Sequence, residues 1–134
     1  MEDRIRVSMR RAMSNVIRDA VSRPQQNTRN VEWLVLLYEE LAQSLKALTP
    51  RRTDLHERID GALDVGLFRQ MLTHDAVDVD DVRVIVAFVY DHLATMCAPS
   101  QDDEVRRLRE AILSHASHGD MVAALLVETH DVLD

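Results

Sequence analysis

The stretch VDDVRVIVAFVYDHLATM, residues 79–96, decides the fold class of this chain. Its apolar residues recur at intervals of three and four, which is the pattern of one helix face: Val82, Ile85, Val86, Val89, Leu93 and Met96. Asp78 is a good N-cap residue, and Asp80 and Asp81 suit the first helical turn because the helix dipole favours acids there. With Val84 and Phe88 beside the stripe, we expect this helix to be shielded on most sides and to form the core.

The same helical period continues upstream of this stretch. Residues 4–20 predict an amphipathic helix that ends before Pro24, and residues 23–30 predict a polar loop. Asn30 is expected to cap a second helix, which is apolar on most sides and is therefore predicted to be central in its bundle. Thr49 and Pro50 end that helix, and Pro50 suits the first position of the next one.

Further helices are predicted around and beyond residues 79–96. A break is expected near Asp64-Val65-Gly66, followed by a short helix through residues 67–72. Downstream, Ser100 and Asp103 form a capping-box pattern, and Gly119-Asp120 separates a last helix. The chain contains only 3 Gly and 3 Pro, too few for an all-β sandwich. We predict an all-α fold, a compact single-domain bundle of six or seven helices over residues 1–134.

Length and composition exclude several classes of protein. The 134 residues suit one domain, and no apolar run approaches the ~20 residues that a transmembrane helix needs. The net charge of −7 argues against a nucleic-acid-binding protein. Cys97 is the single cysteine, so no internal disulfide can form and a reducing, cytoplasmic compartment is expected. At the end of an apolar helix, Cys97 is expected to be buried and inert.

Charge is distributed unevenly along the chain. Residues 1–58 carry eleven basic and eight acidic side chains, whereas residues 59–134 carry five basic and fifteen acidic ones. In the first helix, four arginines lie opposite an apolar stripe of Ile5, Met9, Met13 and Val16: Arg4, Arg10, Arg11 and Arg18. We expect the stripe to pack onto the domain and the arginines to face outward. They are the candidate partner-binding residues, for an acidic protein or an acidic patch of a second copy in a homodimer. A solvated face without a partner is the alternative.

No motif for catalysis, cofactor binding or metal binding is complete. His115 and His118 are three residues apart and would share a helix face, but a zinc site needs three or four ligands. The acidic residues 75–81 lack the central glycine and the final glutamate of a calcium loop, and helix capping explains them better. There is no glycine-rich phosphate loop and no nucleophile elbow. We name no catalytic, cofactor or metal residue and expect a protein that is not an enzyme.

One partial resemblance is to the Bcl-2 family of apoptosis regulators, which includes viral members. RVIVAF, residues 83–88, resembles the central helix of that family, and HGDM, residues 118–121, resembles its last motif. The family's Asn-Trp-Gly-Arg signature is absent, since residues 81–84 are Asp-Val-Arg-Val. An apolar groove beside the helix of residues 79–96 would favour this alternative, in which a BH3-type amphipathic helix is bound. A sealed bundle would disfavour it.

The stronger resemblance is to the T-complex protein 11 family. MCAPSQDDEVRRL, residues 96–108, resembles the family's Leu-Cys-Ala-Pro followed by acidic residues, valine, two basic residues and leucine. In the same order along the chain, LLYEEL (36–41), PRRTDL (50–55), AVDV (76–79) and VLD (132–134) resemble further family segments. Met13-Ser14-Asn15 departs from the family's Phe-Trp-Asp. Longer members continue well beyond this length, so a minimal version and a fragment both stay open.

This resemblance implies a non-enzymatic, intracellular regulatory protein. Members of the family are linked to cyclic-AMP and protein-kinase-A signalling and to sperm function. No catalytic residues carry over from the family, so the resemblance implies a helical interaction module with a protein partner and no cofactor.

Overall fold

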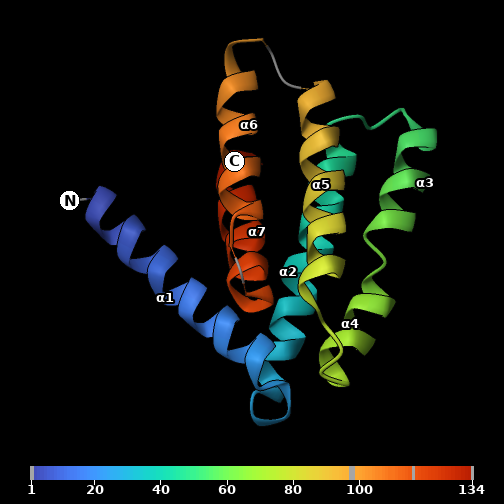
Figure 1. Ribbon diagram of the computed structural model, residues 1–134. Helices are drawn as coiled ribbons and strands as arrows, with labels where there is room; N and C mark the ends of the chain where they lie inside the picture. Colours follow the sequence, from blue (N-terminus) through green and yellow to red (C-terminus); the bar gives the residue numbers. More distant parts are fainter. Residues whose placement is uncertain (1, 97–98, 116, 134) are drawn as a thin grey trace.

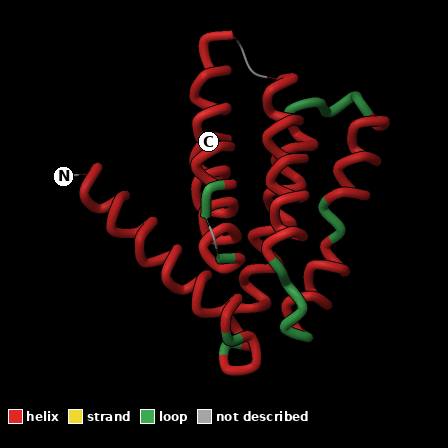
Figure 2. The backbone as a smooth tube through the Cα atoms, viewed as in Figure 1, coloured by secondary structure: helices red, strands yellow, loops and turns green. Residues whose placement is uncertain are grey.

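The computed structural model describes residues 2–96, 99–115 and 117–133, and every regular element in them is helical. The order along the chain is α1 (Glu2–Ser22), a 3-10 turn η1 (Pro24–Gln26), α2 (Thr28–Ala47), α3 (Thr53–Ala62), α4 (Val65–Thr73), α5 (Val79–Met96), α6 (Pro99–Leu113) and α7 (His118–Leu133). The connections are short, as Figure 2 shows. The predicted all-α bundle is confirmed.

Helices α2 and α7 form the centre of the bundle. α7 packs against α1, α2, α5 and α6, while α2 packs against α1, α3 and α4 as well as α7. In Figure 1, α3 and α4 lie on one side of this centre and α1 leaves it on the other. The central place predicted for the second helix is therefore confirmed.

The prediction that α5 is shielded on most sides was wrong. Val86 and Val89 are fully buried, but Ile85 and Phe88 are only half-buried and 70% of Val84 is exposed. The reason is the placement of its neighbours, since α5 packs closely against α6 and α7. The last helix contributes more to the core, with these buried apolar residues: Met121, Val122, Ala123, Leu125, Leu126 and Val127.

The ends of α2 differ from those predicted. The helix begins at Thr28, because the turn η1 reverses the chain within a few residues, so Asn30 lies inside the first turn and does not cap it. At the other end, the Arg52 amide donates to the Thr49 carbonyl at 3.1 Å. Pro50 thus lies in a tight turn, where its fixed φ is favoured, and α3 begins only at Thr53.

The starts of the last two helices also differ from those predicted. α6 begins at Pro99, a residue suited to the first helical position, so Ser100 lies within the helix and not before it. α7 begins at His118, which places Gly119 inside the helix. Gly119 is buried against α1, where an added Cβ would lie 3.5 Å from the Arg18 carbonyl oxygen. That separation is an ordinary van der Waals contact, so the contact between α1 and α7 does not require glycine at this position.

A buried hydrogen bond joins α5 to α7. The hydroxyl groups of Tyr90 and Thr129 are 3.0 Å apart, and both residues are fully buried. Burial raises the pKa of the Tyr90 hydroxyl, so it stays protonated. The bond satisfies two polar groups that would be costly to bury alone.

Tyr90→Phe and Thr129→Val are each expected to lower the free energy of unfolding by about 1–3 kcal/mol, because each leaves a buried hydroxyl without this partner. Urea unfolding of both single variants and the double variant measures the coupling. The double variant should lose less than the two single losses together. Strictly additive losses would contradict a direct bond between the two side chains.

Candidate interaction site

A pocket opens between α4 and α5, over the middle of α2. Its volume is about 200 Å³, and it is lined by Tyr38, Gly61, Ala62, Asp64, Leu67, Phe68, Met71, Asp81, Val84 and Ile85. Among the described helices, α4 packs on α2 and not closely on α5, which leaves this space between them. We call this feature the α4–α5 groove.

The floor of the α4–α5 groove is aromatic. The rings of Tyr38 from α2 and Phe68 from α4 stack with their centroids 4.0 Å apart and their planes 11° from parallel. Both side chains are buried. Burial, with a smaller contribution from Asp64, raises the pKa of the Tyr38 hydroxyl far above its usual value. Tyr38 therefore stays protonated and adds no charge to the floor of the groove.

The rim of the groove is apolar and exposed. Leu67 on α4 is 53% exposed, and Val84 on α5 is 70% exposed. A single exposed leucine or valine is ordinary on a protein surface. Here the two residues line the same groove as the aromatic rings of Tyr38 and Phe68, so the groove is mainly apolar.

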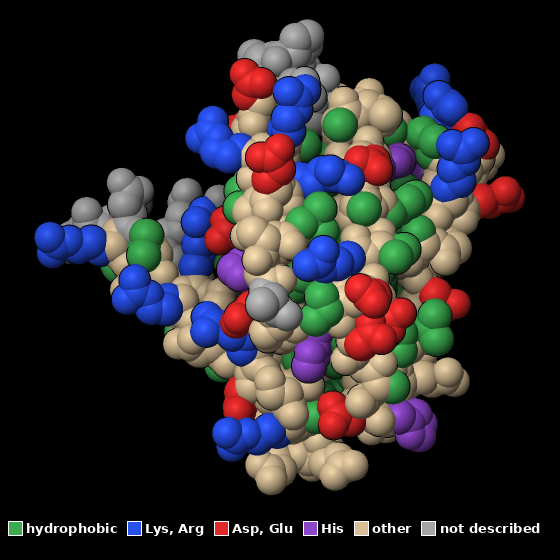
Figure 3. All heavy atoms as spheres, viewed as in Figure 1, with side chains coloured by type: hydrophobic (Ala, Val, Ile, Leu, Met, Phe, Trp, Pro, Cys, Tyr) green, Lys and Arg blue, Asp and Glu red, His purple; other side chains and the backbone are tan. Residues whose placement is uncertain are grey.

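Two carboxylates stand at the edge of this apolar surface, and the helix starts place them there. Asp64 precedes α4 and its Oδ1 accepts a hydrogen bond from the Leu67 amide at 3.1 Å. Asp78 holds the start of α5 in the same way, through the Asp81 amide at 3.0 Å, and Asp81 lines the groove. The predicted break near Asp64 and the predicted cap at Asp78 are both confirmed. Figure 3 shows hydrophobic and acidic side chains side by side over α5.

The four candidate arginines do not form one outward face. Arg4 and Arg11 are exposed. Arg10 instead lies 3.9 Å from Glu128 of α7, and Arg18 lies 3.2 Å from Asp120 at the start of α7. The structure thus turns Arg10 and Arg18 toward the bundle and leaves Arg4 and Arg11 on the open side of α1.

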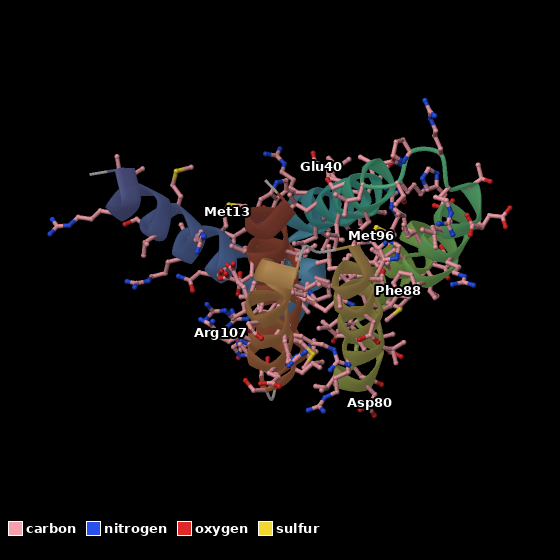
Figure 4. All side chains as sticks on the ribbon, turned by 90° about the horizontal axis from the view of Figure 1, so that it is seen from above. Met13, Glu40, Asp80, Phe88, Met96 and Arg107 are labelled. Atoms are coloured by element: carbon pink, nitrogen blue, oxygen red, sulfur yellow. The ribbon has the colours of Figure 1, made fainter. Side chains whose placement is uncertain are left out.

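The apolar stripe of α1 is not packed along its whole length. Ile17 and Ala20 are fully buried and Met13 is half-buried where α1 meets α7 (Figure 4), but 58% of Ile5 and 60% of Met9 are exposed. The expectation that the stripe packs onto the domain is wrong for three of its four residues, since Val16 is also exposed and only Met13 packs against the core. The second half of α1 is buried through Ile17 and Ala20 instead. The first half of α1 projects from the bundle (Figure 1).

Other candidate chemistry is not assembled. Within the described residues, no three His, Cys, Asp or Glu side chains come together as a metal site would require. His115 lies in the connection before α7 and His118 starts α7, so the two do not share a helix.

Asp75, between α4 and α5, has a φ of 51°, a left-handed turn conformation that aspartate tolerates. Cys97 lies outside the described residues.

Comparison with known proteins places the chain in a family. The family model described as T-complex protein 11 matches residues 1–134. The chain belongs to the T-complex protein 11 family. No solved structure matches it. Within the described part of this family member, no helix combines the length and hydrophobicity needed to cross a membrane.

The groove of this T-complex protein 11 family member was missed by reasoning from sequence, although a signal for it existed. Val84 and Leu67 are exposed. A helix that buries only one face would normally carry polar residues at such positions. Apolar residues on too wide an arc of a helix indicate either a central position or a binding surface. For α5, the structure excludes the shielded position that we predicted, because 70% of Val84 is exposed.

Proposed function

We propose that this member of the T-complex protein 11 family is a non-enzymatic helical interaction module. Its α4–α5 groove receives the apolar face of a basic amphipathic helix from a protein partner. The observation that carries the proposal is the combination of an apolar floor and rim with the carboxylates of Asp64 and Asp81 at one edge.

The size and charge of the groove support a protein partner over a small molecule. Small-molecule pockets usually measure about 300–1,000 Å³, whereas this one measures about 200 Å³. That space suits apolar side chains projecting from a helix, as in other helix-in-groove complexes. Asp64 and Asp81 favour arginine or lysine beside those apolar residues and disfavour acidic ones.

The family suggests where such binding would act. The link of T-complex protein 11 family members to cyclic-AMP and protein-kinase-A signalling supports a regulatory role, and the single cysteine favours a cytoplasmic one. On this proposal the groove holds a helix of a signalling protein and changes that protein's activity. No residue of this chain takes part in chemistry.

A Bcl-2-like function is the second candidate, and one observation favours it. The groove lies beside α5, as expected for a protein that binds a BH3-type helix. The charge is unfavourable, however, because the ion pair expected with a BH3 peptide needs an arginine in the groove. The residues here are Asp64 and Asp81, and Arg83 is not among the lining residues.

Selection from a displayed library of amphipathic helices tests the proposal. Helices selected on the wild-type chain should carry apolar residues at positions i, i+4 and i+7 with arginine or lysine beside them. Val84→Glu should weaken their binding at least about tenfold, equal to 1.4 kcal/mol. Leu36→Glu is the matched control, because Leu36 is a similarly exposed apolar residue on α2 and is not a lining residue.

Two results would contradict this function. Selected helices that bind Val84→Glu as tightly as the wild-type chain would remove the groove from the function. A preference for acidic BH3-type peptides would support the Bcl-2-like candidate instead. For the signalling role, the wild-type chain should shift the cyclic-AMP concentration that half-activates purified protein kinase A, and Val84→Glu should not.

A further inference from the structure

Two surfaces of this molecule have complementary chemistry. The first is the α4–α5 groove, apolar and edged by carboxylates. The second is the projecting half of α1, where the exposed apolar residues Ile5, Met9 and Ala12 lie at positions i, i+4 and i+7. Val16, in the second half of the helix, continues this exposed row at i+11. This spacing is the anchor pattern of helices that lie in apolar grooves.

We propose that the projecting half of α1 from one copy of this chain docks in the α4–α5 groove of a second copy. The inference rests on the proposed function, because it names one helix that the groove receives. The stripe differs from the face that α1 uses inside its own molecule. Met13, Ile17 and Ala20 contact the bundle, and the stripe of Ile5 and Met9 is left open beside them.

Charge selects this pairing among the ways in which two copies could meet. Arg4 and Arg11 are exposed on α1, and Asp64 and Asp81 edge the groove. Pairing α1 with α1 would bring arginines of two copies together, and pairing groove with groove would bring aspartates together. Only the contact of α1 with a groove sets opposite charges against each other, and like-charge contacts are disfavoured.

The positions of the two surfaces require a second molecule. α1 projects on one side of the bundle, and α4 and the start of α5 lie on the other (Figures 1 and 4). The helix therefore cannot enter the groove of its own chain. Because each copy offers one helix and one groove on different sides, the contact is head-to-tail, and association continues beyond a pair or closes into a ring.

Sedimentation of paired variants tests the inference. Met9→Glu disables the helix and Val84→Glu disables the groove, and both substitutions are at residues at least 60% exposed, so the fold should persist. Circular dichroism checks that it does. The wild-type chain should form species heavier than the 15.3 kDa monomer as its concentration rises, and Leu36→Glu should behave like it.

The decisive result is the mixture of the two variants. Each variant alone should stay monomeric, because one half of every contact is missing. Mixed, the intact helix of Val84→Glu should enter the intact groove of Met9→Glu and give a 1:1 complex that grows no further. Self-association of Val84→Glu alone would show pairing through α1, and self-association of Met9→Glu alone would show pairing elsewhere. Either result overturns the inference.

A wild-type chain that stays monomeric at every concentration also overturns the inference. If anionic phospholipid vesicles then bind the wild-type chain but not Met9→Glu, the occupant of the α1 stripe is a lipid surface. These failures are distinguishable from failure of the proposed function. If only the further inference fails, library helices that depend on Val84 still bind the monomeric chain. If neither self-association nor Val84-dependent binding of library helices is found, the groove is removed from both proposals.

Discussion

Phe68→Ala is expected to lower the free energy of unfolding by about 3–5 kcal/mol. Phe68 is buried on α4, and its ring stacks on Tyr38 of α2 at a centroid separation of 4.0 Å. The substitution removes this ring stack between the two helices and leaves a cavity that opens into the groove. Urea unfolding followed by circular dichroism measures the loss.

Two further variants test this explanation. Phe68→Leu keeps much of the volume and should recover most of the stability, losing about 0.5–1.5 kcal/mol from the missing ring stack. Phe88→Ala on α5 is the control, because Phe88 is only half-buried and should cost less. Equal losses for Phe68→Ala and Phe88→Ala would contradict the placement of α4 against α2.

Leu41→Ala is expected to cost about 2–5 kcal/mol, the second largest effect among the substitutions considered. Leu41 is fully buried on α2, which packs against α1, α3, α4 and α7. A cavity there lies at the centre of the bundle, where many side chains are held in place and can relax only in part.

Leu36→Ala is the matched control for Leu41→Ala, since it makes the same chemical change in the same helix. Leu36 is 57% exposed, so its substitution should change stability by no more than about 0.5 kcal/mol. Chemical denaturation of both variants under one set of conditions gives the comparison. Similar losses at both positions would show that α2 is oriented differently in the bundle.

The two surfaces of this family member carry the charge difference between the halves of the chain. The basic first half supplies Arg4 and Arg11 on the projecting part of α1, and Asp81 of the acidic second half edges the groove. Part of this difference is used inside the molecule, where Arg18 pairs with Asp120. Such partly exposed pairs contribute little to stability. On the proposals above, the remaining charge difference serves the contact between α1 and the groove.

Much of the fold could be predicted because helices depend on short-range patterns. The period of three and four residues indicated where helices form, and the break near Asp64 and the cap at Asp78 marked boundaries that the structure confirms. Helix ends that depend on turns were less predictable. Pro50 suits both a helix start and a tight turn, and only the hydrogen bond between Arg52 and Thr49 distinguishes them.

The amino-acid sequence was enough to establish an all-helical chain, the family to which it belongs and the division of charge along it. Which apolar residues are buried was decided by the tertiary structure alone. Val84 and Val86 lie on the same apolar helix, yet one is 70% exposed and the other fully buried. The same division separates Met9 from Ile17 on α1. A pattern of apolar residues indicates which face of a helix can be buried. The number and position of the neighbouring helices decide what it does bury, and the surface left over forms the groove and the projecting helix.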